Sequence, residues 1–119
     1  MENHVIVRTE HMNHQGNLFG GQLLVWVDES AAMTVMTEFP GVRFVTRGFS
    51  QVEFRKPVLN GSILKIVTTR FRVGKTSITY HVEVHAQPPD SKENELVFET
   101  EVTFVALDDK GNKIDIPTG

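Results

Sequence analysis

The sequence predicts an α+β domain in which one long helix packs against one face of an antiparallel sheet. Two observations lead to this fold class. One long segment has helical periodicity, and four segments with strand-like alternation follow it at short spacing. Strands joined by short turns pair in antiparallel fashion, and one face of such a sheet can be buried under a helix. The 119 residues are enough for one domain, residues 1–119, and too few for two.

The N-terminal third contains the first strand, a loop and the helix. Residues 4–9 form a short first strand. Residues 10–19 form a polar loop with turn-forming asparagine and glycine residues. The helix begins near Gly20 and ends before the breaker pair Pro40-Gly41.

The remaining strands are predicted from alternation of apolar and polar residues. They cover residues 44–54, 63–73, 77–87 and 96–106. Gly48 interrupts the first of them and indicates a bulge or a close approach to the backbone. Residues 87–94 are expected to form a mobile loop, and residues 108–119 a frayed polar tail.

The composition narrows the class of protein. No apolar run approaches the ~20 residues that cross a bilayer, and the N-terminus has no apolar signal segment. The chain has no cysteine, which excludes disulfides, thiolate zinc sites and a cysteine nucleophile, and which fits a reducing cytoplasm. A net charge of −3 argues against nucleic-acid binding. We therefore expect a cytoplasmic protein with no membrane or nucleic-acid partner.

The charges are unevenly distributed. Residues 43–75 carry eight basic residues against the single acid Glu53, whereas residues 83–115 carry nine acids against three lysines. Two explanations account for this pattern equally well. The charges belong to solvated strand faces that differ in sign, or the basic segment lines a site for a small phosphorylated molecule. Both interpretations stay open at this point.

Asp28 is the least expected residue of the helix. At 100° per residue it shares an apolar stripe with Gly21, Leu24, Ala31, Ala32 and Val35. The opposite side carries Trp26 and a polar strip of Gln22, Glu29, Ser30 and Thr37. An unpaired carboxylate in apolar surroundings costs several kcal/mol, so Asp28 is a candidate reactive group. The helix is apolar around most of its circumference, which predicts a second copy of the chain against it.

The motif formed by Asn13, Gly16, Phe19, Gly20, Gly21 and Asp28 resembles that of the hotdog-fold acyl-CoA thioesterases. The resemblance extends to FRKPV (54–58), RVGKTS (72–77) and DDKGNK (108–113). It is strongest for the acyl-CoA hydrolase branch, which includes the mammalian brain cytosolic enzyme and small bacterial acyl-CoA thioester hydrolases. This implies a five-stranded antiparallel sheet wrapped around one central helix.

The resemblance also implies an activity and a site. The enzyme would hydrolyse acyl-CoA to free acid and CoA, with Asp28 as general base or nucleophile and Asn13 contributed by the partner subunit. Backbone N–H groups near Gly20 and Gly21 would stabilise the oxyanion. The CoA phosphates would contact residues of the basic segment: Arg55, Lys56, Arg72, Gly74, Lys75 and Ser77. No cofactor is expected, because CoA is part of the substrate. A homodimer is the minimum assembly, with a tetramer or a hexamer left open.

Other interpretations of the same residues have weaker support. Hotdog enoyl-CoA hydratases pair an aspartate with a histidine five residues later, where this chain has Met33. A non-catalytic acyl-CoA sensor has no need of Asp28. The histidines at 4, 11 and 14 lack a complete ligand set, and solvent exposure accounts for those at 81 and 85, so no metal is expected. Ser30 and Ser77 lack the G-x-S-x-G context of a serine hydrolase.

Overall fold

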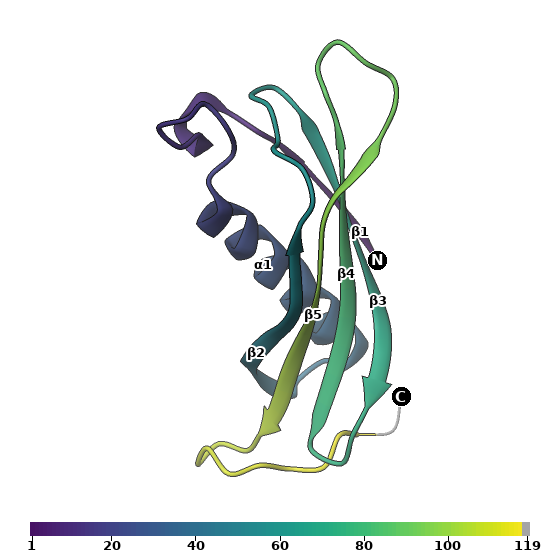
Figure 1. Cartoon of the computed structure of the whole chain (residues 1–119). Coiled ribbons are helices and arrows are strands. Elements are labelled where there is room, and N and C mark those ends of the chain that lie inside the picture. The colour runs from purple at the N-terminus through teal and green to yellow at the C-terminus, as the bar shows by residue number, and fades with distance from the viewer. Residues whose placement is uncertain (118–119) are drawn as a thin grey trace.

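The computed structural model describes residues 1–117 and shows one helix lying across a five-stranded antiparallel sheet (Figure 1). The strand order is β1-β3-β4-β5-β2, so the predicted fold class is confirmed. The helix α1 covers Gly20–Glu38, and a short 3-10 helix covers Thr9–His11. The strands are β1 (Glu2–Ile6), β2 (Arg43–Phe54), β3 (Ile63–Val73), β4 (Ser77–Gln87) and β5 (Glu95–Leu107). Within residues 1–117, no helix is both long and apolar enough to cross a bilayer.

The helix buries one of its faces against the sheet. Its buried residues are Leu23, Val27, Ser30, Ala31, Thr34 and Val35. They meet the inner faces of the strands, where fully buried side chains include Leu64, Ile66, Val82, Val84 and Phe98. Removing this much apolar surface from water is the main stabilising contribution, at roughly 25 cal/mol per Å².

The prediction that Ser30 belongs to a polar, solvated strip is wrong. Ser30 is 2% exposed and faces β1, where the Asn3 side-chain amide donates a 3.0 Å hydrogen bond to its hydroxyl. Its carbonyl oxygen accepts a 2.9 Å hydrogen bond from Thr34 Oγ1. Small hydroxyl residues can be buried cheaply when their polar atoms are satisfied in this way. The buried face therefore shares Ala31 and Val35 with the stripe that carries Asp28 and extends from them to Ser30 and Thr34.

The C-terminal end of α1 is tied to the sheet by Glu38. The buried Tyr80 hydroxyl donates to Glu38 Oε1, and Arg70 Nη2 donates to the same oxygen at 2.8 Å. Partial burial opposes ionisation of this carboxyl group, but the hydrogen bonds from Tyr80 and Arg70 outweigh it and hold the pKa of Glu38 below its usual value. Burial, together with the same hydrogen bond, raises the pKa of Tyr80. Glu38 is therefore an ionised anchor at neutral pH.

The edge strand β2 does not alternate regularly. Its register against β5 shifts between Thr46 and Gly48 and again between Ser50 and Glu53, which confirms the predicted irregularity at Gly48. Continuous alternation predicted Thr46 and Ser50 on the same face, and this is wrong. Thr46 pairs with the inward-facing Phe104, whereas the Ser50 hydroxyl hydrogen-bonds Glu101 on the outer face. Each extra residue of a bulge reverses the facing of those that follow.

Two further boundaries differ from prediction. The first strand ends at Ile6 instead of residue 9, because the chain turns there into the 3-10 helix, where the His11 ring accepts the Arg8 N–H at 2.9 Å. The described part of the C-terminal tail is not frayed. Ile114 N–H donates to Ala106 O at 3.0 Å, and Ile116 N–H donates to Lys75 O at 2.8 Å. The remaining tail residues, 118–119, lie outside the described part of the chain.

We predict that Ile116→Ala destabilises the protein by about 1 kcal/mol, because the Ile116 side chain is half-buried against the core. Asp115→Ala is the matched control, since this neighbouring side chain is exposed. Urea unfolding of both variants measures the difference. Equal stability of the two would show that the Ile116 side chain does not stabilise the fold.

Candidate active site

Asp28 lies on the part of α1 that the sheet leaves uncovered. Its carboxylate is half-buried, and Oδ1 accepts a 2.7 Å hydrogen bond from the Thr46 hydroxyl of β2. On the same helix, Val25, about one turn before Asp28, and Met36, about two turns after it, are 51% and 61% exposed. Asp28 is thus a carboxylate with one oxygen fixed by a neutral donor, at the border of an exposed apolar surface. This arrangement leaves its second oxygen available to a water molecule or a substrate.

Sequence reasoning missed Thr46. The available signal was its position two residues after Phe44, which places a hydroxyl group beside an apolar side chain on the same face of the predicted strand. The helix residue that Thr46 meets depends on how α1 crosses β2, and local sequence does not determine that crossing.

The start of α1 combines a free helix end with close aromatic packing. Phe19 is the N-cap, and its carbonyl accepts from the N–H groups of Gln22 and Leu23 at 3.1 and 3.2 Å. Because phenylalanine has no side-chain acceptor, it offers no cap to the N–H groups of Gly20 and Gly21. These N–H groups, at the positive end of the helix dipole, can stabilise an oxyanion.

The two glycines also have a packing role. A Cβ at Gly20 would lie 3.3 Å from the Phe54 ring, and a Cβ at Gly21 would lie 2.6 Å from the Phe19 ring. Gly20 and Phe54 also line a cavity of about 230 Å³ with Leu18, Leu23, Arg55, Lys56, Pro57 and Val58. The absence of side chains at Gly20 and Gly21 therefore lets aromatic rings pack closely against the start of the helix. This packing role is separate from any role of their N–H groups in a reaction.

Asn13 shapes the loop before the helix. Its side-chain oxygen accepts from the N–H groups of Gln15 and Asn17 at 2.9 and 3.1 Å, and Gly16 completes the turn with a φ of 80°. Among the hydrogen bonds of residues 1–117, none joins Asn13 to Asp28. The expected contact between Asn13 of one subunit and Asp28 of another requires two chains and stays a prediction.

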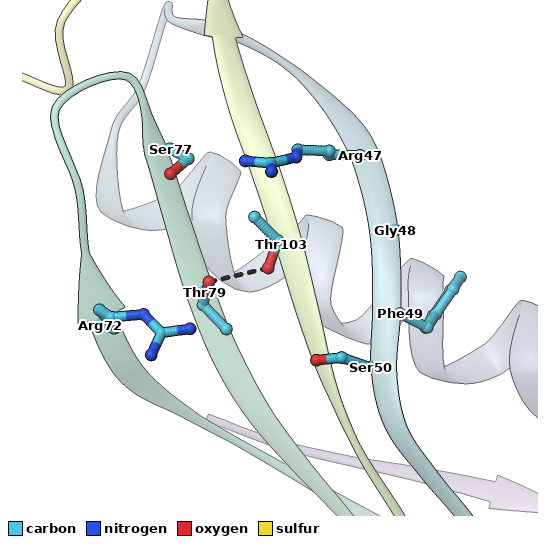
Figure 2. A pocket seen from close by; sticks show the side chains of 8 residues that line it. All are labelled: Arg47, Gly48, Phe49, Ser50, Arg72, Ser77, Thr79 and Thr103. Atoms are coloured by element: carbon cyan, nitrogen blue, oxygen red, sulfur yellow. Dashed lines mark hydrogen bonds between the residues drawn. The ribbon is translucent and has the colours of Figure 1, made fainter.

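Two of the predicted phosphate-binding residues lie together on the outer face of the sheet. Figure 2 shows Arg72 and Ser77 beside a cavity of about 420 Å³, with Arg47 reaching over it from β2. Thr79 and Thr103 form its floor and share a 2.8 Å hydrogen bond between their hydroxyl groups. Guanidinium groups surrounded by hydroxyls are the groups that bind phosphate oxygens.

The turn beside this cavity is held from both sides. The Gly74 N–H donates to Ser77 O at 2.8 Å, and Lys75 O accepts from the C-terminal tail. A Cβ at Gly74 would lie 3.0 Å from Ser77 Oγ, so glycine keeps the serine close to the turn. Lys75 itself is exposed at the tip of this turn.

The other two predicted phosphate ligands lie elsewhere. Arg55 pairs with Glu53 at 2.8 Å and with Glu99, and Lys56 pairs with Glu95 at 3.5 Å. Both residues line the cavity at the start of α1. The structure therefore divides the predicted binding residues into two groups, one near Arg72 and one near Gly20. Arg47 is the residue that sequence reasoning missed, although it lies within the basic segment.

A long helix packed on a five-stranded antiparallel sheet matches the hotdog-fold thioesterase structures. The family model of the thioesterase superfamily matches residues 15–93. The chain belongs to this superfamily.

Within the superfamily, the chain resembles acyl-CoA thioester hydrolases. It is 31% identical over 108 residues to an acyl-CoA thioester hydrolase of Haemophilus influenzae, a match that covers 88% of this chain and 70% of the relative. A relative from Bacillus subtilis, also named as an acyl-CoA thioester hydrolase, is 29% identical over 105 residues, and the matched region covers 88% of this chain and 60% of that protein.

Solved structures give the same result. An acyl-CoA hydrolase from Staphylococcus aureus, solved with butyryl-CoA, CoA and CoA disulfide, is 32% identical with a TM-score of 0.88 over 98% of this chain and 71% of that one. Structures of that enzyme with an aspartate, an asparagine or a threonine replaced by alanine are also similar. A hexameric hotdog-fold thioesterase of Campylobacter jejuni is 32% identical, with a TM-score of 0.87 over 97% of this chain and 88% of that one.

Proposed function

We propose that this chain hydrolyses acyl-CoA thioesters to the free acid and CoA. The observation that carries the proposal is the position of Asp28. It is a half-buried carboxylate, held by Thr46 and placed on the uncovered side of a helix whose first N–H groups have no side-chain cap. Membership of the thioesterase superfamily and likeness to acyl-CoA thioester hydrolases support the substrate class.

Asp28 acts as the general base. Its free oxygen takes a proton from water, and the hydroxide formed adds to the thioester carbonyl carbon. The tetrahedral intermediate collapses by breaking the C–S bond, and the CoA sulfur leaves as a thiolate that then takes up a proton. Direct attack by the carboxylate, through an anhydride that water then hydrolyses, uses the same residue in the same place. Thr46 keeps the carboxylate oriented in either case.

One subunit is too small to hold the whole site. Asp28 lies seven positions after Gly21, and at 1.5 Å per residue this places them about 10 Å apart along the helix. A carbonyl oxygen bound at the helix start is therefore beyond the reach of the carboxylate of the same chain. Asp28 and the N–H groups of Gly20 and Gly21 act together when they come from different subunits, with Asn13 accompanying the helix start.

The exposed apolar surface fits such an assembly. β2 is an edge strand with Val52 and Phe54 at 42% and 55% exposure, and the uncovered side of α1 adds Val25 and Met36. An apolar edge strand of this length pairs readily with another chain. We propose a homodimer that covers both surfaces. The hexameric state of the Campylobacter relative favours further assembly of dimers.

The cavity beside Arg72 is proposed to hold the phosphates of CoA. Arg47 and Arg72 supply the charge, and Ser77 supplies a hydroxyl. Lys75 lies on the turn between β3 and β4. Gly74 allows this turn to stay tight. Arg55 and Lys56 lie near the helix start and are proposed to contact the part of CoA that enters there.

Asp28→Asn is predicted to lower kcat at least about 100-fold, because removal of a general base typically costs this much or more. Release of the CoA thiol from acyl-CoA esters of increasing chain length measures the loss. Glu29→Gln is the control, since Glu29 is an exposed neighbour on the same helix and should keep wild-type activity. Thr46→Val should cause a smaller loss than Asp28→Asn.

Two results would count against this mechanism. A loss of only a few-fold in Asp28→Asn would exclude Asp28 as base or nucleophile. Tight binding of CoA esters without any thiol release by the wild type would instead favour a non-catalytic acyl-CoA sensor or another acyl-CoA reaction such as hydration.

Arg72→Gln is predicted to raise KM for acyl-CoA about tenfold with little change in kcat, because one charge-assisted contact to phosphate is worth about 1.4 kcal/mol or more. The KM for an acyl-pantetheine, which lacks the nucleotide, should stay unchanged. Lys110→Gln, in the exposed C-terminal turn, is the control. Equal effects on both substrates would place the phosphates elsewhere.

The wild type is predicted to have the mass of a dimer or a multiple of it in multi-angle light scattering. Val52→Lys should weaken this assembly, because a charged residue on an edge strand opposes pairing with another chain. Leu59→Lys, which alters a similarly exposed apolar residue in the loop after β2, should not. A monomeric wild type would contradict the two-subunit site.

A further inference from the structure

The outer face of the sheet carries a cluster of histidine and glutamate side chains that the proposed reaction does not use. Alternation along β4 places Tyr80, Val82 and Val84 in the core. The residues between them, His81, Glu83 and His85, point to the outer face and are half-buried. Glu99 of β5 lies directly opposite Glu83 in the strand register. We refer to these four residues, His81, Glu83, His85 and Glu99, as the His–Glu cluster.

Three side chains of the cluster point to a common position. His81 Nε2 lies 3.2 Å from Glu83 Oε2 and 3.6 Å from Glu99 Oε1, and one ligand atom from each residue lies within 4.8 Å of the other two. A tetrahedral zinc ion with bonds of about 2.0–2.2 Å holds its donor atoms roughly 3.3–3.6 Å apart. We propose that His81, Glu83 and Glu99 form a binding site for a divalent transition-metal ion, with zinc as the best match.

The remaining atoms of the cluster support the same geometry. Each proposed carboxylate ligand offers one oxygen to the common position and has the other oxygen held by a neighbour. Glu83 Oε1 lies 3.1 Å from His85 Nε2, and Glu99 Oε2 accepts from Arg55. Hydrogen bonds of this kind orient metal ligands in established sites. All three ligands stand on the paired central strands β4 and β5, which fixes their backbone positions.

The local charges favour a cation over an ion-pair network. The single atom His81 Nε2 faces both Glu83 and Glu99, so one N–H would have to serve two carboxylates. Glu53, Glu99 and Glu101 line an adjoining open cavity of about 290 Å³, where Arg55 is the accompanying cation. Lys65 lies opposite His85 in the register, on the side away from Glu99. The carboxylates that face the cluster therefore outnumber its cations, and a divalent ion reduces their repulsion.

The donor set selects the type of ion. Imidazole nitrogen with carboxylate oxygen suits zinc and other first-row transition metals, whereas calcium and magnesium prefer all-oxygen sites. Asp28 lies under the opposite face of the sheet, so this ion has no place in the proposed hydrolysis. The bound ion would join β4 and β5 on the outer face of the sheet and so stabilise the folded chain. This proposal does not rest on the proposed function.

Calorimetric titration of the metal-free chain, residues 1–119, with zinc chloride tests the proposal. We expect one zinc ion per chain, and a melting temperature that rises with zinc and returns after chelation. His81→Gln and Glu83→Gln should each weaken zinc binding more than tenfold. His85→Ala removes an orienting contact and should weaken it about tenfold.

His14→Gln is the matched control, because it removes one exposed histidine from the loop before α1 and leaves the cluster intact. Circular dichroism and oligomer mass establish that each variant is folded. If His81→Gln does not fold, Glu83→Gln carries the test. Equal zinc affinity in the wild type and in the folded cluster variants would overturn the proposal. So would loss of the binding in His14→Gln, or a wild type that binds zinc no better than calcium.

Discussion

The packing of α1 on the sheet is the interaction on which the rest of the structure depends. One face of the helix, including Val27, Ala31 and Val35, is fully buried against the inner face of the sheet. Its C-terminal end is tied down by Glu38 through Tyr80 and Arg70. A single sheet can cover only one side of a helix. Because the other side is also apolar around Val25 and Met36, Asp28 stands at the border between a settled core and a surface suited to a second chain.

This position explains how a carboxylate can be both half-buried and available. Thr46 donates a hydrogen bond to one oxygen of Asp28. Because the threonine hydroxyl is neutral, the carboxylate keeps its full negative charge, which a guanidinium group would have neutralised. A second subunit would remove more water from the same carboxylate. The chemistry proposed for Asp28 thus depends on assembly as much as on the fold of one chain.

The two faces of the sheet have different tasks, and the alternation of β4 separates them. Side chains on its inner face complete the core. Those on its outer face form the His–Glu cluster and, nearer the turn at Gly74, the cavity with Arg47 and Arg72. Phosphates and a metal ion would therefore bind on the side of the sheet opposite the helix, at positions separated along the strands.

Much of this could be predicted from the sequence because periodicity is local. The helix from Gly20, the ends of β3 and β4, and the tight turn at Gly74 follow from residues within one turn or one strand of each other. The errors arose where distant segments decide. The hydroxyl of the buried Ser30 accepts a hydrogen bond from Asn3, which is 27 residues away in the sequence. The tail is held by a hydrogen bond from the Ile116 N–H to the Lys75 carbonyl oxygen. Thr46 was missed as a partner of Asp28 for the same reason, and the roles of the predicted site residues depend on a second subunit.

The irregular register of β2 has a consequence for how this protein tolerates change. The bulge between Thr46 and Gly48 leaves Thr46 facing inward and Ser50 facing outward, and the bulge after Ser50 restores the first alternation before Phe54. The number of residues in β2 is therefore as important as their identity, because deletion of one residue would exchange the inner and outer faces over part of the strand. The loop at residues 88–94 has no such phase to keep. Natural variation in chain length should accumulate in that loop and spare β2, whatever side chains the exposed edge comes to carry.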